Sequence, residues 1–276
     1  MKNQTWFITG VSGGFGKALA EELVKQGKQV IATFRKEEQA KTFESTYGNQ
    51  VRAVLLDVNE TNTIDTVVQQ AWAFFQGVDV VVNNAGYGLT GAVEETTEAE
   101  IRAQMETNFF GALFVTKAFL PKFRLQGHGT FVQISSQAGI SSTPGLGIYN
   151  ASKFALEGFS EALSKEAVHL GIRVMLVEPG PFRTDWAGNS MVFSPVELAE
   201  YASSAGVMRR RLSQISGNQP GDPIKGVQLI IRAVDSEKMP LRLALGNIAV
   251  DTISAKLKQV QADIETWEQE SRATDF

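Results

Sequence analysis

Short apolar runs alternate with segments of helical periodicity along most of this chain, and that order restricts the folds open to it. The runs read as strands, while the segments between them suit helices of ten or more residues. Apolar strands separated by such helices are typical of a parallel sheet covered on both faces. The seven runs cover residues 6–8, 29–33, 51–56, 78–82, 130–134, 173–178 and 241–245.

The length fits one large domain. With 276 residues, of which 43% are apolar, the chain can bury a substantial core. We therefore expect an α/β fold, a single doubly wound domain over residues 1–276, with a seven-stranded parallel sheet and helices on both faces.

A glycine-rich loop joins the first strand to the first helix. The loop is Thr9-Gly-Val-Ser-Gly-Gly-Phe-Gly16, and residues 17–26 after it have helical periodicity. Glycines allow a tight turn and a close backbone approach, while the N–H groups and dipole of a helix N-terminus favour a pyrophosphate. The spacing differs from G-x-G-x-x-G, but the same physics predicts a dinucleotide site.

Two further glycine patterns have other interpretations. Residues 10–14 match G-x-S-x-G, the elbow that presents a nucleophilic serine, which would be Ser12. A hydrolase elbow needs earlier strands and an oxyanion loop, and only nine residues precede Gly10, so this alternative is disfavoured. Residues 86–91 match G-x-G-x-x-G, but no helix opens at the third glycine, and we interpret them as a loop.

The end of the second strand bears on the choice of cofactor. A carboxylate at this junction would accept from a ribose 2′-OH, whereas a cation would pair with a 2′-phosphate. Here Phe34 is followed by Arg35 and Lys36. This favours NADP(H) over NAD(H), although an arginine at a strand end can also be plain surface.

Residues 135–153 place a hydroxyl, a phenol and an ammonium within reach of one proton. Tyr149 and Lys153 have i,i+4 spacing, which on a helix puts their Cβ atoms about 5–6 Å apart. A neighbouring ammonium favours the phenolate and lowers the pKa of a tyrosine. Ser136, after the run 130–134, could hydrogen-bond the same substrate oxygen. Alone, a Tyr with Lys at this offset is usually just a helix surface.

Other polar residues fall where strands end or a helix is interrupted. Asp57, Asn84 and Gly86 follow the third and fourth strands, at the edge where such sheets bind ligands. Asn and Gly are also ordinary turn residues. Asn108 lies within a long helix over residues 98–123, where its amide competes for backbone hydrogen bonds. We expect a kink or a held water there, or else a tolerated polar residue.

Two C-terminal segments are expected to lie outside the core. Residues 185–221 lose periodicity and mix large apolar side chains with Gly, Ser and Asn, which favours a lid over a site. The apolar residues of this lid either line an apolar substrate or pack against each other. Residues 251–270 carry an apolar helical face, which we expect to pack against the body or a sister subunit. That face contains Ile253, Leu257, Val260, Ile264 and Trp267.

Composition excludes several classes of function. The net charge is −4 without a basic stripe, which argues against nucleic acid and anionic membranes as partners. The cluster at residues 209–211 is interpreted as the solvated face of a short helix. With no cysteine and two histidines, no metal site is expected. No run approaches the ~20 apolar residues of a membrane span, and the N-terminus lacks a signal peptide, so a cytoplasmic protein is expected.

Taken together, these motifs resemble the short-chain dehydrogenase/reductase family over about residues 4–250. Within the family the chain is similar to NADP-preferring ketoreductases near the hydroxysteroid and retinol dehydrogenases, partly through residues 32–35 and 149–158. The resemblance implies an oxidoreductase with one Rossmann-type domain, assembled as a homodimer or homotetramer on two long helices.

The resemblance also implies roles for individual residues. Ser136 would orient the substrate oxygen, Tyr149 would exchange its proton, Lys153 would lower the pKa of Tyr149 and bind the nicotinamide ribose, and Asn108 would hold a water in a proton relay. The residues it implies for cofactor binding are Gly10, Ser12, Gly14, Phe15, Gly16, Arg35, Asp57, Val58, Asn84, Gly86, Tyr149, Lys153, Pro179, Gly180 and Thr184.

The expected reaction is reversible hydride transfer between NADP(H) and a carbonyl or secondary alcohol of an apolar small molecule. The alternative from another class is a dinucleotide-binding sensor or scaffold without turnover. Substrate identity is left open, because residues 186–220 and those past 250 match no particular member of the family.

Overall fold

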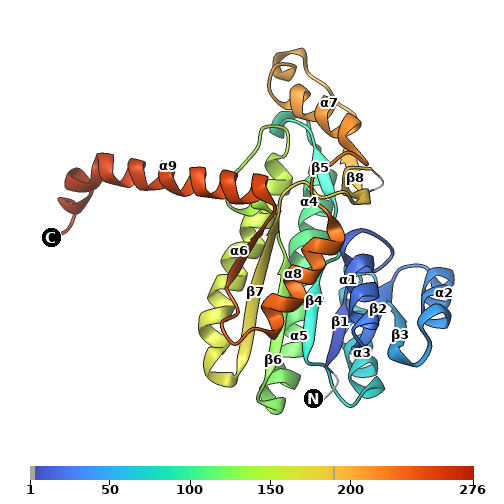
Figure 1. Ribbon diagram of the computed structural model, residues 1–276. Helices are drawn as coiled ribbons and strands as arrows, with labels where there is room; N and C mark the ends of the chain where they lie inside the picture. The colour runs from blue at the N-terminus through green and yellow to red at the C-terminus, as the bar shows by residue number, and fades with distance from the viewer. Residues whose placement is uncertain (1–3, 189) are drawn as a thin grey trace.

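The computed structural model describes residues 4–188 and 190–276 and contains the expected seven-stranded parallel sheet (Figure 1). Its strand order is β3-β2-β1-β4-β6-β7-β9, and every pair is parallel. The chain thus winds outward from β1 to one edge and then from β4 to the other. The strands are β1 (Thr5–Ile8), β2 (Gln29–Phe34), β3 (Val51–Leu55), β4 (Val80–Asn83), β6 (Gly129–Ile134), β7 (Ile172–Pro179) and β9 (Arg242–Leu245).

Helices cover both faces of this sheet, as expected from strands that are apolar throughout. On one face α1 (Gly14–Lys25), α2 (Glu37–Tyr47) and α8 (Pro223–Asp235) bury their apolar residues against the strands. On the other face α3 (Thr61–Phe74), α5 (Gly111–Gln126) and α6 (Gly147–Ala167) do the same. The doubly wound fold class is therefore confirmed.

The helix expected over residues 98–123 is interrupted at the position that the sequence singled out. It consists of α4 (Glu98–Met105), a π-helical turn (Glu106–Phe110) and α5, which follow one another directly. Asn108 lies in the π turn and is buried. Because a π turn carries one extra residue, it changes the direction of the side chains around it, and such turns are frequent at functional sites.

One part of the fold was not predicted. The structure pairs β5 (Gly88–Thr90) with β8 (Met191–Phe193) in a separate two-stranded parallel sheet, so the interpretation of residues 86–91 as a loop was wrong for three of them. Strands of three residues are too short for a recognisable periodicity, and their pairing joins distant parts of the chain. The lid segment also contains α7 (Ala205–Ile215).

The last helix, α9 (Asn247–Arg272), projects away from the body of the molecule (Figure 1). Ala249 in its first turn is fully buried, but from Leu257 onward every residue of the helix is exposed. Of the two expected partners of this helix, the body is therefore excluded for its outer turns, because nothing in the described chain covers them, and a sister subunit stays a prediction. None of the helices in residues 4–188 and 190–276 is long and apolar enough to cross a membrane.

Candidate active site

Tyr149 and Lys153 lie in the first two turns of α6, at the carboxyl edge of the sheet. Both side chains are buried, with exposed fractions of 5% and 6%. Their i,i+4 spacing brings the Lys153 amine to 5.8 Å from the centre of the Tyr149 ring. Lys153 Nζ donates a hydrogen bond of 2.8 Å to the carbonyl oxygen of Ile134, the last residue of β6. Strand β6 therefore fixes the position of the amine.

Burial changes the proton affinities of this pair. It lowers the pKa of Lys153 to about 8, against the attraction of Glu157, which raises the pKa. It also raises the pKa of Tyr149 to about 12, and a hydrogen bond with Ser136 acts in the opposite direction. This differs from the lowering of the tyrosine pKa that we expected from Lys153, because the loss of water around the phenol outweighs the influence of its neighbours.

Ser136 is placed by the turn that follows β6. Its hydroxyl caps the short 3₁₀ helix Gln137–Gly139 by accepting a hydrogen bond of 3.1 Å from the N–H of Ala138. It also donates to the carbonyl oxygen of Pro179 at 3.5 Å. The Ser136 hydroxyl is thus oriented by two backbone groups and lies close enough to Tyr149 for both to contact one substrate oxygen.

Asn108 connects the π turn to the segment after β4. Its Oδ1 accepts from the N–H of Tyr87 at 3.0 Å, and its Nδ2 donates to the carbonyl oxygen of Tyr87 at 2.9 Å. Nδ2 also lies 3.2 Å from the hydroxyl of Ser152, next to Lys153 on α6. These contacts hold the chain beside Gly86. The role of Asn108 in a proton relay stays a prediction.

The glycine loop forms a cradle that side chains would fill. Gly10 and Gly14 have φ angles of +71° and +56°, which other residues rarely adopt. A Cβ atom on Gly16 would lie 2.5 Å from the carbonyl oxygen of Gly10 and 2.4 Å from Asn84 Nδ2. The loop leads directly into the N-terminus of α1. The residues present therefore fit a dinucleotide pyrophosphate, which such a terminus favours.

Asn84 supports this loop from the neighbouring strand end. Its Nδ2 donates to the carbonyl oxygens of Thr9 and Gly10, at 2.9 and 3.0 Å. Its own backbone N–H donates to the hydroxyl of Thr9. The side chain expected to contact the adenosine side of the cofactor is therefore already engaged, and it positions the glycine loop from within the protein.

The residues expected near the adenosine follow β2 and β3. Phe34 is buried and packs against Phe43, with ring centres 5.4 Å apart, while Arg35 next to it is exposed. Asp57 is half-buried, and its Oδ1 accepts from the N–H of Asn59 at 3.0 Å. Val58 is buried in the core between β3 and α3. All of these residues lie at the carboxyl edge, but Val58 presents no polar side chain there.

Residues 179–184 turn the chain across the same edge toward the glycine loop. Cβ atoms built on Gly13 and Gly14 would lie 3.4 Å from Asp185 Oδ2 and 3.8 Å from Thr184 Cβ. Thr184 caps the 3₁₀ turn Asp185–Ala187. The structure thus brings Pro179, Gly180 and Thr184 to the edge that also carries Tyr149, Lys153 and the glycine loop. Within that loop the side chain of Ser12 is exposed and that of Phe15 is half-buried.

Apolar side chains of the lid close over the phenol. The ring centres of Trp186 and Tyr149 lie 5.2 Å apart. The apolar residues of the lid therefore pack against each other and against the Tyr149 ring, and whether they also line an apolar substrate stays a prediction. The cluster consists of Ala138, Leu146, Tyr149, Met191 and Leu212, with Trp186, Phe193 and Met208 packed against it.

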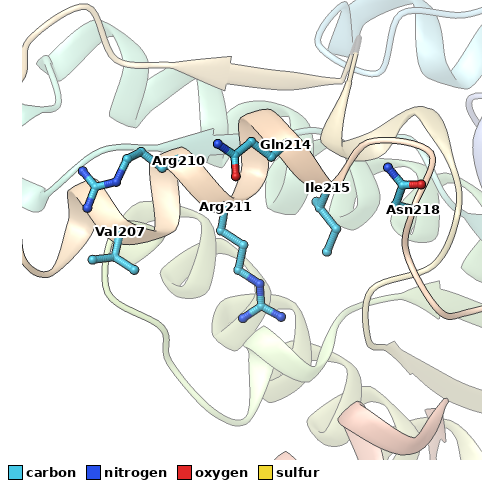
Figure 2. Close-up of a pocket in the computed structure, with 6 residues that line it drawn as sticks. All are labelled: Val207, Arg210, Arg211, Gln214, Ile215 and Asn218. Carbon is cyan, nitrogen blue, oxygen red and sulfur yellow. The ribbon is translucent and has the colours of Figure 1, made fainter.

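A separate pocket of about 550 Å³ lies along α7 (Figure 2). Arg210 and Arg211 are exposed beside it, while Arg209 is partly covered and binds Glu197, so the solvated-face interpretation fits two of the three arginines. None of the residues that line this cavity belongs to the set around Tyr149. They are Val207, Arg210, Arg211, Gln214, Ile215 and Asn218.

Sequence reasoning missed a partly buried charged network directly behind Lys153. Arg242 on β9 contacts Glu157, Glu161 and Glu178 through its guanidinium, at 3.1, 2.8 and 3.5 Å. Burial, with the charge of Glu157, raises the pKa of Glu178 to about 7. The i,i+4 series of residues 153, 157 and 161 was the signal for the helical part of this network. The contributions of β7 and β9 depend on the tertiary fold.

The geometry excludes a serine hydrolase built on Ser12. This residue follows β1, at the carboxyl edge of the sheet. His128 directly precedes β6, and His169 lies in the turn before β7, so both histidines are at the amino edge. Neither histidine is therefore within reach of the Ser12 hydroxyl, and Ser12 belongs to the glycine loop.

Comparisons with known proteins agree with this arrangement. A family model described as short chain dehydrogenase matches residues 4–192. The chain is 38% identical to Oxidoreductase BOA17 of Botryotinia fuckeliana, over 98% of both chains. It is 35% identical to 3-ketodihydrosphingosine reductase of Bacteroides thetaiotaomicron, over 94% of this chain and 93% of that protein. A crystal structure of a short-chain dehydrogenase from Streptomyces avermitilis superposes with a TM-score of 0.93, at 43% identity and full coverage of both chains.

Proposed function

The chain belongs to the short-chain dehydrogenase family and is an oxidoreductase that acts on alcohols or carbonyls with a nicotinamide cofactor. We propose that its cofactor is NADP(H) and that its substrate is a long apolar ketone or secondary alcohol. The observation that carries this proposal is the position of Tyr149. Its phenol contacts Ser136, lies one helical turn from Lys153, and is covered by the apolar ring of Trp186.

The buried residues can exchange one proton with a substrate oxygen. When bound, NADPH supplies the hydride that adds to the carbonyl carbon. In that direction Ser136 orients the carbonyl oxygen and Tyr149 donates its proton to it, giving the alcohol. The raised pKa keeps the phenol protonated until the carbonyl oxygen takes up its proton. Lys153 holds its charge beside the phenolate that remains until a proton returns from solvent. In the opposite direction Tyr149 accepts the proton of the alcohol.

The preference for NADP(H) is supported by the end of β2. Phe34 points into the core, so no carboxylate stands where it would accept from a ribose hydroxyl and repel a 2′-phosphate. The exposed guanidinium of Arg35 is free to pair with that phosphate in two parallel hydrogen bonds, since among the described residues it forms no ion pair.

The apolar lid supports the class of substrate. Trp186, Met191 and Leu212 bring aromatic and aliphatic surface to the reactive hydroxyl, and such surface favours an aliphatic chain. The name of the relative from Bacteroides thetaiotaomicron describes a ketone on a long-chain base. We propose a substrate of the same kind, with a carbonyl on an extended hydrocarbon.

Replacement of Tyr149 by Phe tests the proposal. The variant keeps the ring under Trp186 and lacks the proton, so we expect turnover of long-chain ketones to fall by about 10²–10⁴-fold while the Kd for NADPH is unchanged. Tyr201→Phe is the control, because this hydroxyl binds Glu94 at the surface. Turnover that survives the first substitution would contradict the catalytic assignment.

The rival function, a dinucleotide sensor without turnover, makes a different prediction. If the protein were such a sensor, NADPH would bind, but the absorbance of the reduced cofactor at 340 nm would not change with any member of a panel of ketones and alcohols of increasing chain length. A binding module does not need a buried phenol held between a serine and a lysine, which is why we favour the enzyme.

A further inference from the structure

The exposed face of α9 repeats with the period of a coiled coil. Its large apolar residues follow each other at intervals of three and four, which places them at positions a and d of three consecutive heptads. Val250, Leu257 and Ile264 occupy the a positions, and Ile253, Val260 and Trp267 the d positions. All but Ile253 are 40–63% exposed, although each would normally be buried.

The remaining faces of α9 are polar or small. Positions b, c and f hold charged, hydroxyl, amide and alanine side chains, and several make contacts along the helix itself, such as Arg272 with Glu268 and Gln261 with Glu265. The helix therefore carries one apolar stripe, which runs about 25 Å along its axis from Val250 to Trp267. A projecting helix of this kind is stable when a second helix covers the stripe.

We propose that α9 binds the α9 helix of a second copy of this chain in an antiparallel coiled coil. With the two-fold axis between Lys258 and Gln259, every a residue faces a d residue of the other helix. Leu257 then packs on Val260 of the partner subunit, Ile253 on Ile264, and Val250 on Trp267. The six layers are all apolar, so the whole stripe is covered at once.

The flanking charges select this orientation. Positions g of α9 include Lys256 and Asp263, and in the antiparallel register Lys256 lies beside Asp263 of the partner subunit, twice by symmetry. A parallel, in-register pair would instead place Asp263 beside Glu268 of the partner subunit, which is a repulsion. Within residues 4–188 and 190–276, neither Lys256 nor Asp263 forms an ion pair, so both are available to a partner.

The charges also argue against a membrane surface as the occupant. Helices that lie on anionic bilayers are rich in Lys and Arg on their polar face. Here Asp and Glu outnumber Lys and Arg by five to three over Asn247–Arg272. A second copy, whose lysine meets an aspartate, fits the polar flanks better.

Sedimentation of the full-length protein tests the association. We expect Leu257→Glu with Ile264→Glu to halve the mass of the assembly, because both a positions become charged. The matched control, Ala255→Glu with Ala262→Glu, adds the same charges on the opposite face and should leave the mass unchanged. An unchanged mass in the first variant would overturn the proposal. The proposal would also be overturned if the unmodified protein were monomeric and sedimented together with phosphatidylglycerol vesicles.

Disulfide trapping tests the orientation, and a chain without cysteine suits it. An equimolar mixture of the Lys256→Cys and Asp263→Cys proteins should oxidise mainly to the mixed dimer, because the two positions are neighbours across the antiparallel interface. Val250→Cys should not couple with itself, since its two copies lie about 25 Å apart along the axis. Efficient coupling of Val250→Cys with itself would indicate a parallel pair and contradict the proposed register.

Discussion

The ring of Trp186 lies against the ring of Tyr149, with their centres 5.2 Å apart and their planes inclined by 55°. Trp186 follows directly after the Thr184 cap at the start of the lid, and Tyr149 is on α6, so this contact joins the lid to the reactive hydroxyl. A substrate carbonyl must reach a phenol that is only 5% exposed. The lid therefore has to move, or the indole has to swing aside, before each turnover.

Replacement of Trp186 by Ala should separate substrate binding from chemistry. The truncation removes one wall for an apolar chain and leaves Ser136, Tyr149 and Lys153 in place. We expect the KM for long-chain ketones to rise about tenfold, and that for short ketones to change little, because an aromatic contact contributes about 1 kcal/mol beyond its buried area. Steady-state kinetics across a chain-length series measures this. Phe276→Ala, which removes a fully exposed aromatic side chain outside the apolar stripe of α9, is the control, and equal effects on short and long ketones would contradict the assignment.

Replacement of Arg35 by Asp should reverse the cofactor preference. The carboxylate would repel a 2′-phosphate and accept from a 2′-OH, so the ratio of kcat/KM for NADPH to that for NADH should fall by about 10- to 100-fold. Kinetics with both cofactors at one substrate concentration gives the ratio. Lys41→Asp, an exposed lysine farther along α2 that pairs with Glu37, should leave it unchanged. An unaltered ratio in the first variant would place the phosphate elsewhere.

The seven strands of the main sheet were predictable because they carry their own signal. Residues 6–8 and 80–82 are apolar and are buried in the sheet. The pair β5 and β8 lacks such a signal, since each strand has three residues and Gly88 pairs with Met191, which lies far along the chain. The apolar face of α9 was recognised from its spacing, but whether it met the body depended on the direction in which the helix leaves Gly246.

The site was predictable where one element carries two of its residues. Tyr149 and Lys153 share α6, so their relation follows from helical geometry. The raised pKa of Tyr149 did not follow, because burial under Trp186 depends on how the lid folds back. The contacts of Asn84 with Thr9 and Gly10 did not follow from the sequence either, since they depend on the adjacency of β1 and β4.

Replacement of Asn84 by Ala should weaken cofactor binding without touching the cofactor. Two carbonyl oxygens of the glycine loop would lose their donor, and the loss of such a bond in a partly buried site changes the free energy by about 1–3 kcal/mol. We expect the Kd for NADPH to rise about tenfold, as measured by fluorescence titration, with a smaller loss of thermal stability. Asn59→Ala, which alters an exposed amide bonded to Thr107, is the control. An unchanged Kd would show that the loop keeps its shape unaided.

Glu178 links the charged network behind Lys153 to the pH dependence of stability. Burial, with the nearby charge of Glu157, raises its pKa to about 7 from an ordinary value near 4.5. The native site favours the protonated form of this carboxyl group. Its contribution to stability is therefore fully present below about pH 4.5, where the group is protonated in both the native and the unfolded protein. That contribution is lost as the pH rises through about 7, because the native protein then holds a buried negative charge.

Replacement of Glu178 by Gln should remove this loss. The free energy of unfolding of the variant, relative to the unmodified protein, is expected to increase by about 2 kcal/mol between pH 5 and pH 8, as urea titrations at several pH values would show. Glu161→Gln is a matched control, because this carboxylate also binds Arg242. Hydrogen bonds with Lys165 and Arg242 lower the pKa of Glu161 to about 2, so its contribution to the free energy of unfolding is lost only at lower pH. The difference in the free energy of unfolding between Glu161→Gln and the unmodified protein should therefore stay constant between pH 5 and pH 8. A flat difference for Glu178→Gln as well would mean that Arg242 keeps Glu178 ionised in the native protein throughout this range.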